Sequence, residues 1–96
     1  MSKFKIGKLV ATRKVSERIG KDPAFGAFVS ESIRRYEKCD WGDLPKPDKR
    51  MNSKAVKEGG RILAAYIYSD IHSADAIWII TESDRSVTTV LFRSEY

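Results

Sequence analysis

The fold is decided by the C-terminal part of the chain, which reads RILAAYIYSDIHSADAIWIITESDRSVTTVLFR (residues 61–93). From residue 61 the sequence period is two, and the segment is rich in Ile, Val, Tyr, Trp and Thr, which favour strands. The pattern predicts strands at Arg61–Ser69, Ala76–Glu82 and Ser86–Arg93, joined by a longer loop at Ser69–Asp75 and a tight turn at Ser83–Arg85. We expect these three strands to form an antiparallel meander.

Upstream of the meander, the sequence predicts one strand and a short helix. The run Phe4–Ala11 begins with strand alternation and slips phase near Gly7, which is typical of a strand with a bulge. Thr12 is a suitable N-cap for a helix over Arg13–Ile19, and Gly20 is a suitable residue to end it.

Two further helices are predicted between Asp22 and Gly60. Asp22 followed by Pro23 is a strong helix start, and the helix ends near Lys38. Its apolar stripe recurs at steps of three and four residues: Phe25, Phe28, Val29, Ser32, Ile33 and Tyr36. Residues 39–46 are a loop by composition. Pro47 then opens a third helix, which ends at Gly59–Gly60.

These elements predict a single α+β domain over residues 1–96. The order is β-α-α-α-β-β-β, a two-layer sandwich with a mainly antiparallel sheet of about four strands and helices on one face. The N-terminal strand is expected at the sheet edge. Both faces of the sheet carry apolar residues, since Leu63, Ala65 and Ile67 oppose Ile62, Ala64 and Tyr66. The second face is therefore expected either to be closed by loops or to meet another molecule, such as a second copy of the chain.

Composition excludes several classes of protein. With 42% hydrophobic and 32% charged residues, the 96-residue chain is typical of a folded domain. No apolar run approaches the roughly 20 residues needed to span a bilayer, and the first residues lack the apolar stretch of a secretory signal. We expect a cytoplasmic protein. One cysteine and one histidine exclude an internal disulfide and the usual zinc clusters. An all-carboxylate Mg²⁺ site stays open, but no D-x-D or E-x-x-E cluster indicates one, and we expect neither a metal nor a cofactor.

The positive charge is concentrated at the N-terminus. Residues 1–21 carry seven basic residues and one acidic residue, whereas the remaining residues carry 11 basic and 12 acidic residues, so the net charge of +5 comes from the first fifth of the chain. Such asymmetry predicts attraction to nucleic acid or to an acidic protein surface. The candidate contact residues are Lys3, Lys5, Lys8, Arg13, Lys14 and Arg18. A solvated segment that is basic only for solubility is the alternative.

No catalytic constellation stands out in the sequence. Cys39 and His72 could form a nucleophile–base pair, and Asp40 and Asp43 could act as paired carboxylates. A half-buried thiol and turn-forming aspartates are the simpler interpretations.

Two loops supply candidate partner-binding residues. Trp41, with Asp40 and Asp43 beside it, is either a plug over the seam between helices and sheet or an interface anchor. Asp84 and Arg85 lie at the predicted hairpin tip, where they are either ordinary turn residues or recognition residues.

Three motifs resemble a family of small bacterial proteins carried on plasmids, phages and integrative elements. They are FKIGKLVATR (residues 4–13), DWGDL (residues 40–44) and IITESDRSVTTVLF (residues 79–92). The resemblance implies no catalytic residues. It does imply that the protein is carried on a mobile element. Small single-domain proteins of mobile elements are often counter-defence inhibitors, such as anti-CRISPR proteins, so this role is inferred from the genetic setting and not from a site in the chain.

Three hypotheses follow for the function. The first is a non-enzymatic inhibitor that binds a bacterial defence nuclease, such as a CRISPR effector. The second is a nucleic-acid-binding accessory or regulatory factor that uses the basic N-terminal segment. The third is a small enzyme or toxin-like factor that uses Cys39, His72 or Asp40.

Overall fold

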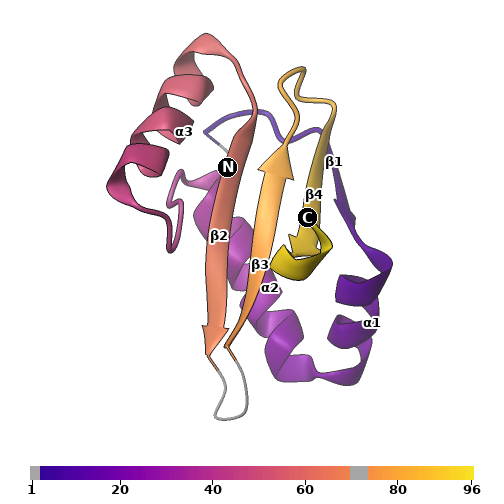
Figure 1. The fold of residues 1–96 in the computed structure, drawn as a ribbon. Coiled ribbons are helices and arrows are strands. Elements are labelled where there is room, and N and C mark those ends of the chain that lie inside the picture. Colours follow the sequence, from indigo (N-terminus) through magenta and orange to yellow (C-terminus); the bar gives the residue numbers. More distant parts are fainter. Residues whose placement is uncertain (1–2, 70–73) are drawn as a thin grey trace.

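The computed structural model describes residues 3–69 and 74–96. Its elements follow in the order β1 (Lys8–Ala11), α1 (Arg13–Lys21), α2 (Pro23–Glu37), α3 (Lys46–Glu58), β2 (Ile62–Ser69), β3 (Ala74–Thr81), β4 (Val87–Phe92) and a short 3-10 turn, η1 (Arg93–Glu95). This order confirms the predicted α+β class (Figure 1). β3 begins two residues before its predicted start, and residues 70–73 of the predicted loop lie outside the described residues.

The strands form one mixed sheet in the order β1-β4-β3-β2. β2 with β3, and β3 with β4, make the predicted antiparallel pairs, with Ile79 opposite both Ala64 and Val90. β1 lies at the edge, as predicted, and runs parallel to β4, with Val10 opposite Thr89. A parallel pair requires a long crossover connection, which the three helices and two strands between β1 and β4 provide.

β1 is shorter than predicted because of Gly7. The φ angle of Gly7 is 65°, and a Cβ atom at this position would overlap the backbone of Arg85 and Ser86. The chain therefore turns at Gly7, in a backbone conformation that only glycine adopts readily. Pairing begins one residue later, where the Lys8 N–H donates to the Ser86 carbonyl at 3.0 Å. The predicted bulge is thus a turn that precedes the strand.

The starts of α1 and α2 form as their sequences predict. The Thr12 hydroxyl accepts a hydrogen bond from the Val15 N–H at 3.3 Å, and the Asp22 carboxylate accepts one from the Phe25 N–H at 3.2 Å. Each cap satisfies a backbone donor that the first helical turn leaves unpaired. Within the described part of the chain, no helix is long and apolar enough to cross a bilayer.

The core lies between one face of the sheet and helices α1 and α2 (Figure 1). Along α2 the predicted stripe is only partly buried: Phe28 and Ile33 are half-exposed, and four of its members are fully enclosed. The buried hydrophobic residues are Val15, Phe25, Val29, Tyr36, Trp41, Ile62, Ala64, Tyr66, Ile77, Ile79 and Val90.

The third helix does not cover the same face. α3 lies along the outer edge of β2, so the expectation that all helices lie on one face is not confirmed (Figure 1). The Asn52 side chain holds α3 there, because its amide donates to the Leu63 carbonyl at 2.8 Å and accepts from the Leu63 N–H at 3.3 Å. α3 therefore protects a strand edge.

The second face of the sheet is partly closed by the C-terminal turn. η1 places the ring of Tyr96 4.8 Å from that of Trp78. Ile80 and Leu91 are buried, whereas Ile67 remains 50% exposed. The chain itself therefore covers the β3–β4 half of this face, which is the first of the two predicted ways to close it.

Candidate binding surface

Trp41 is a core residue. Only 3% of it is exposed, and its ring lies 5.8 Å from Phe4 and 5.6 Å from Tyr36. Its indole N–H donates to the Ser53 hydroxyl at 3.3 Å, which joins the loop to α3. Of the two interpretations of Trp41, its burial and ring contacts support the plug over the seam between helices and sheet.

Asp40 is held by an ion pair within the chain. Arg35 donates to its two carboxylate oxygens at 2.7 and 3.2 Å, and the Gly42 N–H donates to one of them at 3.2 Å. The hydrogen bond from Arg35 lowers the pKa of the Asp40 carboxyl below its usual value. Asp40 therefore remains ionised at neutral pH, which does not suit a general acid.

Asp43 forms hydrogen bonds with the backbone at the outer edge of β2. Its backbone N–H donates to the Ala65 carbonyl at 2.8 Å, and its carboxylate accepts from the Ile67 N–H at 2.9 Å. The two loop aspartates therefore bind different groups, Arg35 and the β2 backbone. The structure does not support paired carboxylates in acid–base work.

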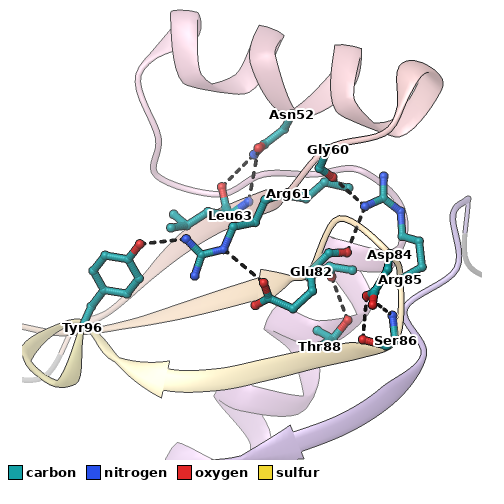
Figure 2. Close-up of polar contacts among 12 residues, drawn as sticks. Asn52, Gly60, Arg61, Leu63, Glu82, Asp84, Arg85, Ser86, Thr88 and Tyr96 are labelled. Atoms are coloured by element: carbon teal, nitrogen blue, oxygen red, sulfur yellow. Dashed lines mark hydrogen bonds and ion pairs between the residues drawn. The ribbon is translucent and has the colours of Figure 1, made fainter.

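The β3–β4 turn binds the end of α3 through Arg85. The Arg85 guanidinium donates to the carbonyls of Gly60 at 2.6 Å and Glu82 at 3.2 Å (Figure 2). It also donates to the Ala55 carbonyl at 2.9 Å. A cation at this position also complements the negative end of the helix dipole. Arg85 thus joins three segments of the chain, and its side chain is committed to that contact.

Asp84 shapes the same turn. Its carboxylate accepts from the Ser86 N–H at 2.9 Å and from the Ser86 hydroxyl at 2.6 Å, and these bonds lower its pKa (Figure 2). All five candidate partner-binding residues of the two loops therefore make contacts within the chain, and sequence composition alone gave no means to identify their partners.

The chemistry proposed for Cys39 finds no support in its surroundings. Cys39 is a free, half-buried thiol whose pKa is raised by burial, although nearby Lys3 opposes that rise. A raised pKa disfavours the thiolate that a nucleophilic cysteine needs. His72 lies outside the described residues. Across residues 3–69 and 74–96, no group of three or more His, Cys, Asp and Glu side chains could hold a metal ion.

A buried polar network was not anticipated from the sequence. The Tyr36 hydroxyl lies 2.7 Å from that of Thr81, which lies 2.7 Å from that of Thr88, and Thr88 donates to the Ile6 carbonyl at 2.6 Å. Burial raises the pKa of Tyr36 to about 12. Threonine is common in strands, so the residue type alone gives no sign that Thr88 links the N-terminal segment to the core.

The basic candidates divide into three groups. Lys3 is exposed beside the end of α2, where its backbone N–H donates to the Glu37 carbonyl at 2.9 Å. Arg18 pairs with Asp22 at 3.4 Å and its guanidinium lies 4.8 Å from the Phe25 ring, so it packs against the protein. The remaining four are exposed on β1, on α1 or just before β1, and we call them the β1–α1 surface: Lys5, Lys8, Arg13 and Lys14.

The cations of the β1–α1 surface are largely free to interact. Arg13 pairs with Glu17 at 3.0 Å, but both side chains are more than half exposed, so the pair contributes little to stability. Lys5, Lys8 and Lys14 form no ion pair with any described residue. Because these three lysines are exposed and have no ion-pair partner in the described part of the chain, they would attract an anionic partner.

A shallow groove of about 660 Å³ lies between α3 and the start of β2. Met51, which is 69% exposed, lines it together with Leu44 and Leu63. Among the titratable groups on its wall, Glu58 forms an ion pair with Lys54 at 4.0 Å, and Arg61 forms one with Glu82 at 3.6 Å. Neither of these ion pairs resembles a catalytic acid–base pair.

Comparison of this chain with known proteins identifies no relative. Neither protein-family models, nor curated proteins, nor solved structures match this chain significantly. The resemblance to proteins of mobile elements therefore stays a prediction based on the three quoted motifs.

Proposed function

We propose that the protein is a non-enzymatic, counter-defence inhibitor that binds a bacterial defence nuclease, such as a CRISPR effector, through its β1–α1 surface. We choose this surface because its lysines lack the partners within the chain that the charged loop residues have. The loop residues Asp40, Asp84 and Arg85 are engaged within the chain, whereas Lys5 and Lys8 are exposed and form no ion pair with residues 3–69 or 74–96. The counter-defence setting rests on the motif resemblance alone.

The Trp41 loop is not part of this proposal. Because Trp41 is buried against Phe4 and Tyr36, a partner could reach it only after the core had opened. A variant at Trp41 would therefore change binding through the folding equilibrium, and it is a poor probe of a contact surface.

Nucleic-acid binding is the second candidate, because phosphates would be attracted by the same three lysines. The two candidates differ in their dependence on salt. Each phosphate neutralised on duplex DNA contributes about −0.9 to the slope of log affinity against log salt, so three contacts give a slope of about −3. A protein complex with apolar and backbone contacts depends less steeply on salt.

Affinity capture from a bacterial host lysate, with and without nuclease digestion and at low and high salt, tests the proposal. We expect a defence nuclease to be recovered after digestion and at high salt, and the purified protein to inhibit its DNA cleavage. Recovery of nucleic acid alone, lost at high salt, would support the second candidate and overturn the first.

A pair of charge-matched variants locates the surface. Lys8→Glu/Lys14→Glu should weaken the complex about tenfold, because two attractive charges become repulsive. Lys46→Glu/Lys57→Glu changes the net charge equally at two exposed residues of α3 and should leave binding within about twofold of the wild type. Equal loss in both variants would indicate attraction to net charge and not to this surface.

A further inference from the structure

The two edges of the sheet are treated differently by the fold. At the β2 edge, Asn52 binds the N–H and the carbonyl of Leu63, while Asp43 binds the Ala65 carbonyl and the Ile67 N–H. Four outward backbone groups of β2 are thus satisfied by side chains or by the loop before α3. This is the protection that edge strands usually need against pairing with other chains.

β1 forms the other edge, and its outward groups have no such cover. The Lys8 N–H donates to the carbonyl of Ser86, just before β4, and the Thr12 N–H donates to the carbonyl of Val90 in β4, at 3.0 Å each. Because successive backbone groups of a strand point in opposite directions, the N–H and carbonyl of Leu9 and Ala11 point away from β4. No described element pairs with them (Figure 1). The Leu9 residue is 44% exposed beside these groups.

The charges around β1 restrict what can pair with it. Lys8 belongs to the strand and Lys5 precedes it, and both are exposed without an ion pair among the described residues. Two copies of β1 side by side would place these lysines near one another, which disfavours a dimer through this edge. An acidic strand would place carboxylates opposite the lysines.

The backbone groups favour a polypeptide over a nucleic acid. The edge offers two N–H donors and two carbonyl acceptors. Phosphate oxygens accept hydrogen bonds but cannot donate to the two carbonyls, whereas an extended chain supplies donors and acceptors in alternation. Strand addition to an open sheet edge is an established mode of peptide recognition, with side-chain contacts that add specificity.

We propose that β1 is a docking strand, to which an extended, acidic segment of a partner protein adds as a fifth strand by hydrogen bonds to Leu9 and Ala11. This inference rests on the proposed function, because it assigns the part of the partner that the β1–α1 surface binds. The acidic side chains meet Lys5 and Lys8, and an apolar side chain of the segment packs on Leu9.

Amide hydrogen exchange with a synthetic peptide tests the docking strand. The probe is a blocked ten-residue peptide of alternating Glu and Val, and its control replaces alternate Val by Pro, which removes backbone donors. With the probe in excess, exchange of the Leu9 and Ala11 amides should slow at least tenfold. The Lys8 and Thr12 amides already donate to the Ser86 and Val90 carbonyls, so their exchange should change little. Unchanged exchange at Leu9 and Ala11, or equal protection by the control peptide or by duplex DNA, overturns the inference.

Two variants at one position separate backbone pairing from side-chain contact. Leu9→Pro removes one outward N–H, at an edge position where proline is tolerated, and should weaken probe binding about tenfold. Leu9→Ala keeps the N–H and should weaken it about threefold. If Leu9→Pro does not fold, the exchange measurement on the wild type still decides.

The lysate capture distinguishes the two proposals. A defence nuclease retained equally by wild type and a folded Leu9→Pro variant would leave the proposed function standing and overturn the docking strand. Protection of Leu9 and Ala11 by the peptide, with only nucleic acid recovered from the lysate, would support the docking strand and overturn the proposed function.

Discussion

The contact between the β3–β4 turn and the end of α3 predicts a large loss of stability when Arg85 is truncated. Its guanidinium binds the carbonyls of Ala55, Gly60 and Glu82. Hydrogen bonds from a charged group contribute about 1.5–3 kcal/mol each. Because Arg85 is only half-buried and water can reach the freed carbonyls, we take about 1 kcal/mol for each bond. Arg85→Ala should therefore lower the free energy of unfolding by about 3 kcal/mol.

A glycine at the same position separates the side-chain contact from the backbone conformation. The φ angle of Arg85 is 62°, in the left-handed region, where a residue with a Cβ atom is disfavoured by about 1 kcal/mol relative to glycine. Arg85→Ala keeps that strain, whereas Arg85→Gly relieves it. We expect Arg85→Gly to lose about 2 kcal/mol.

Urea unfolding followed by circular dichroism measures both losses, and the melting temperature of Arg85→Ala should fall by about 15 °C for a chain of this size. Arg50→Ala, at an exposed residue of α3, is the control and should change the free energy by less than about 0.5 kcal/mol. Wild-type stability in Arg85→Ala would refute the role of the guanidinium. An Arg85→Gly variant less stable than Arg85→Ala would refute the argument from backbone strain.

Three other changes have expected outcomes. Trp41→Ala should lower the free energy of unfolding by about 3–4 kcal/mol, since it empties a buried site, and loss of binding at unchanged thermal stability would contradict the plug. Asn52→Ala should lose about 1–2 kcal/mol and expose the β2 edge, so sedimentation should reveal concentration-dependent association; a monomer at all concentrations would argue against edge protection. Burial raises the pKa of Tyr36 from 10.0 to about 12, because the neutral hydroxyl is favoured in the folded state. The stabilisation of the folded state by this neutral hydroxyl is fully present below pH 10 and is lost as the pH rises toward 12. Between pH 10 and pH 12, urea titrations should show a smaller fall in the free energy of unfolding for Tyr36→Phe than for the wild type. Identical pH profiles would contradict the role given to the Tyr36 hydroxyl.

Much of the fold was predictable because it depends on local patterns. Asp22 and Pro23 start α2 where their cap chemistry indicates, and the period of two after Gly60 marks β2, β3 and β4. The parallel direction of β1 was not predictable, because strand direction in a sheet depends on which edge the chain returns to. The position of α3 depended on Asn52, whose partners on Leu63 lie in another element.

The candidate site was predicted less well, because sequence shows where charges are but not what neutralises them. Asp40, Asp84 and Arg85 had the residue types of a recognition surface, and the structure gives each of them partners within the chain. The signal that survives is the excess of lysine near the N-terminus. Nothing in the sequence distinguished Leu9 from any other strand residue, because an open edge is a property of the assembled sheet.

The order of residues alone was enough to locate most of the helices and strands, because residue spacing and caps act over a few residues. It also showed that the excess of positive charge lies in the first fifth of the chain. Tertiary contacts determine that Trp41 is enclosed and that Asn52 and Asp43 protect the β2 edge. They also leave the outward backbone groups of β1 without a partner among the described residues. Burial and pairing are set by neighbours that are distant in sequence, so only the folded chain fixes them.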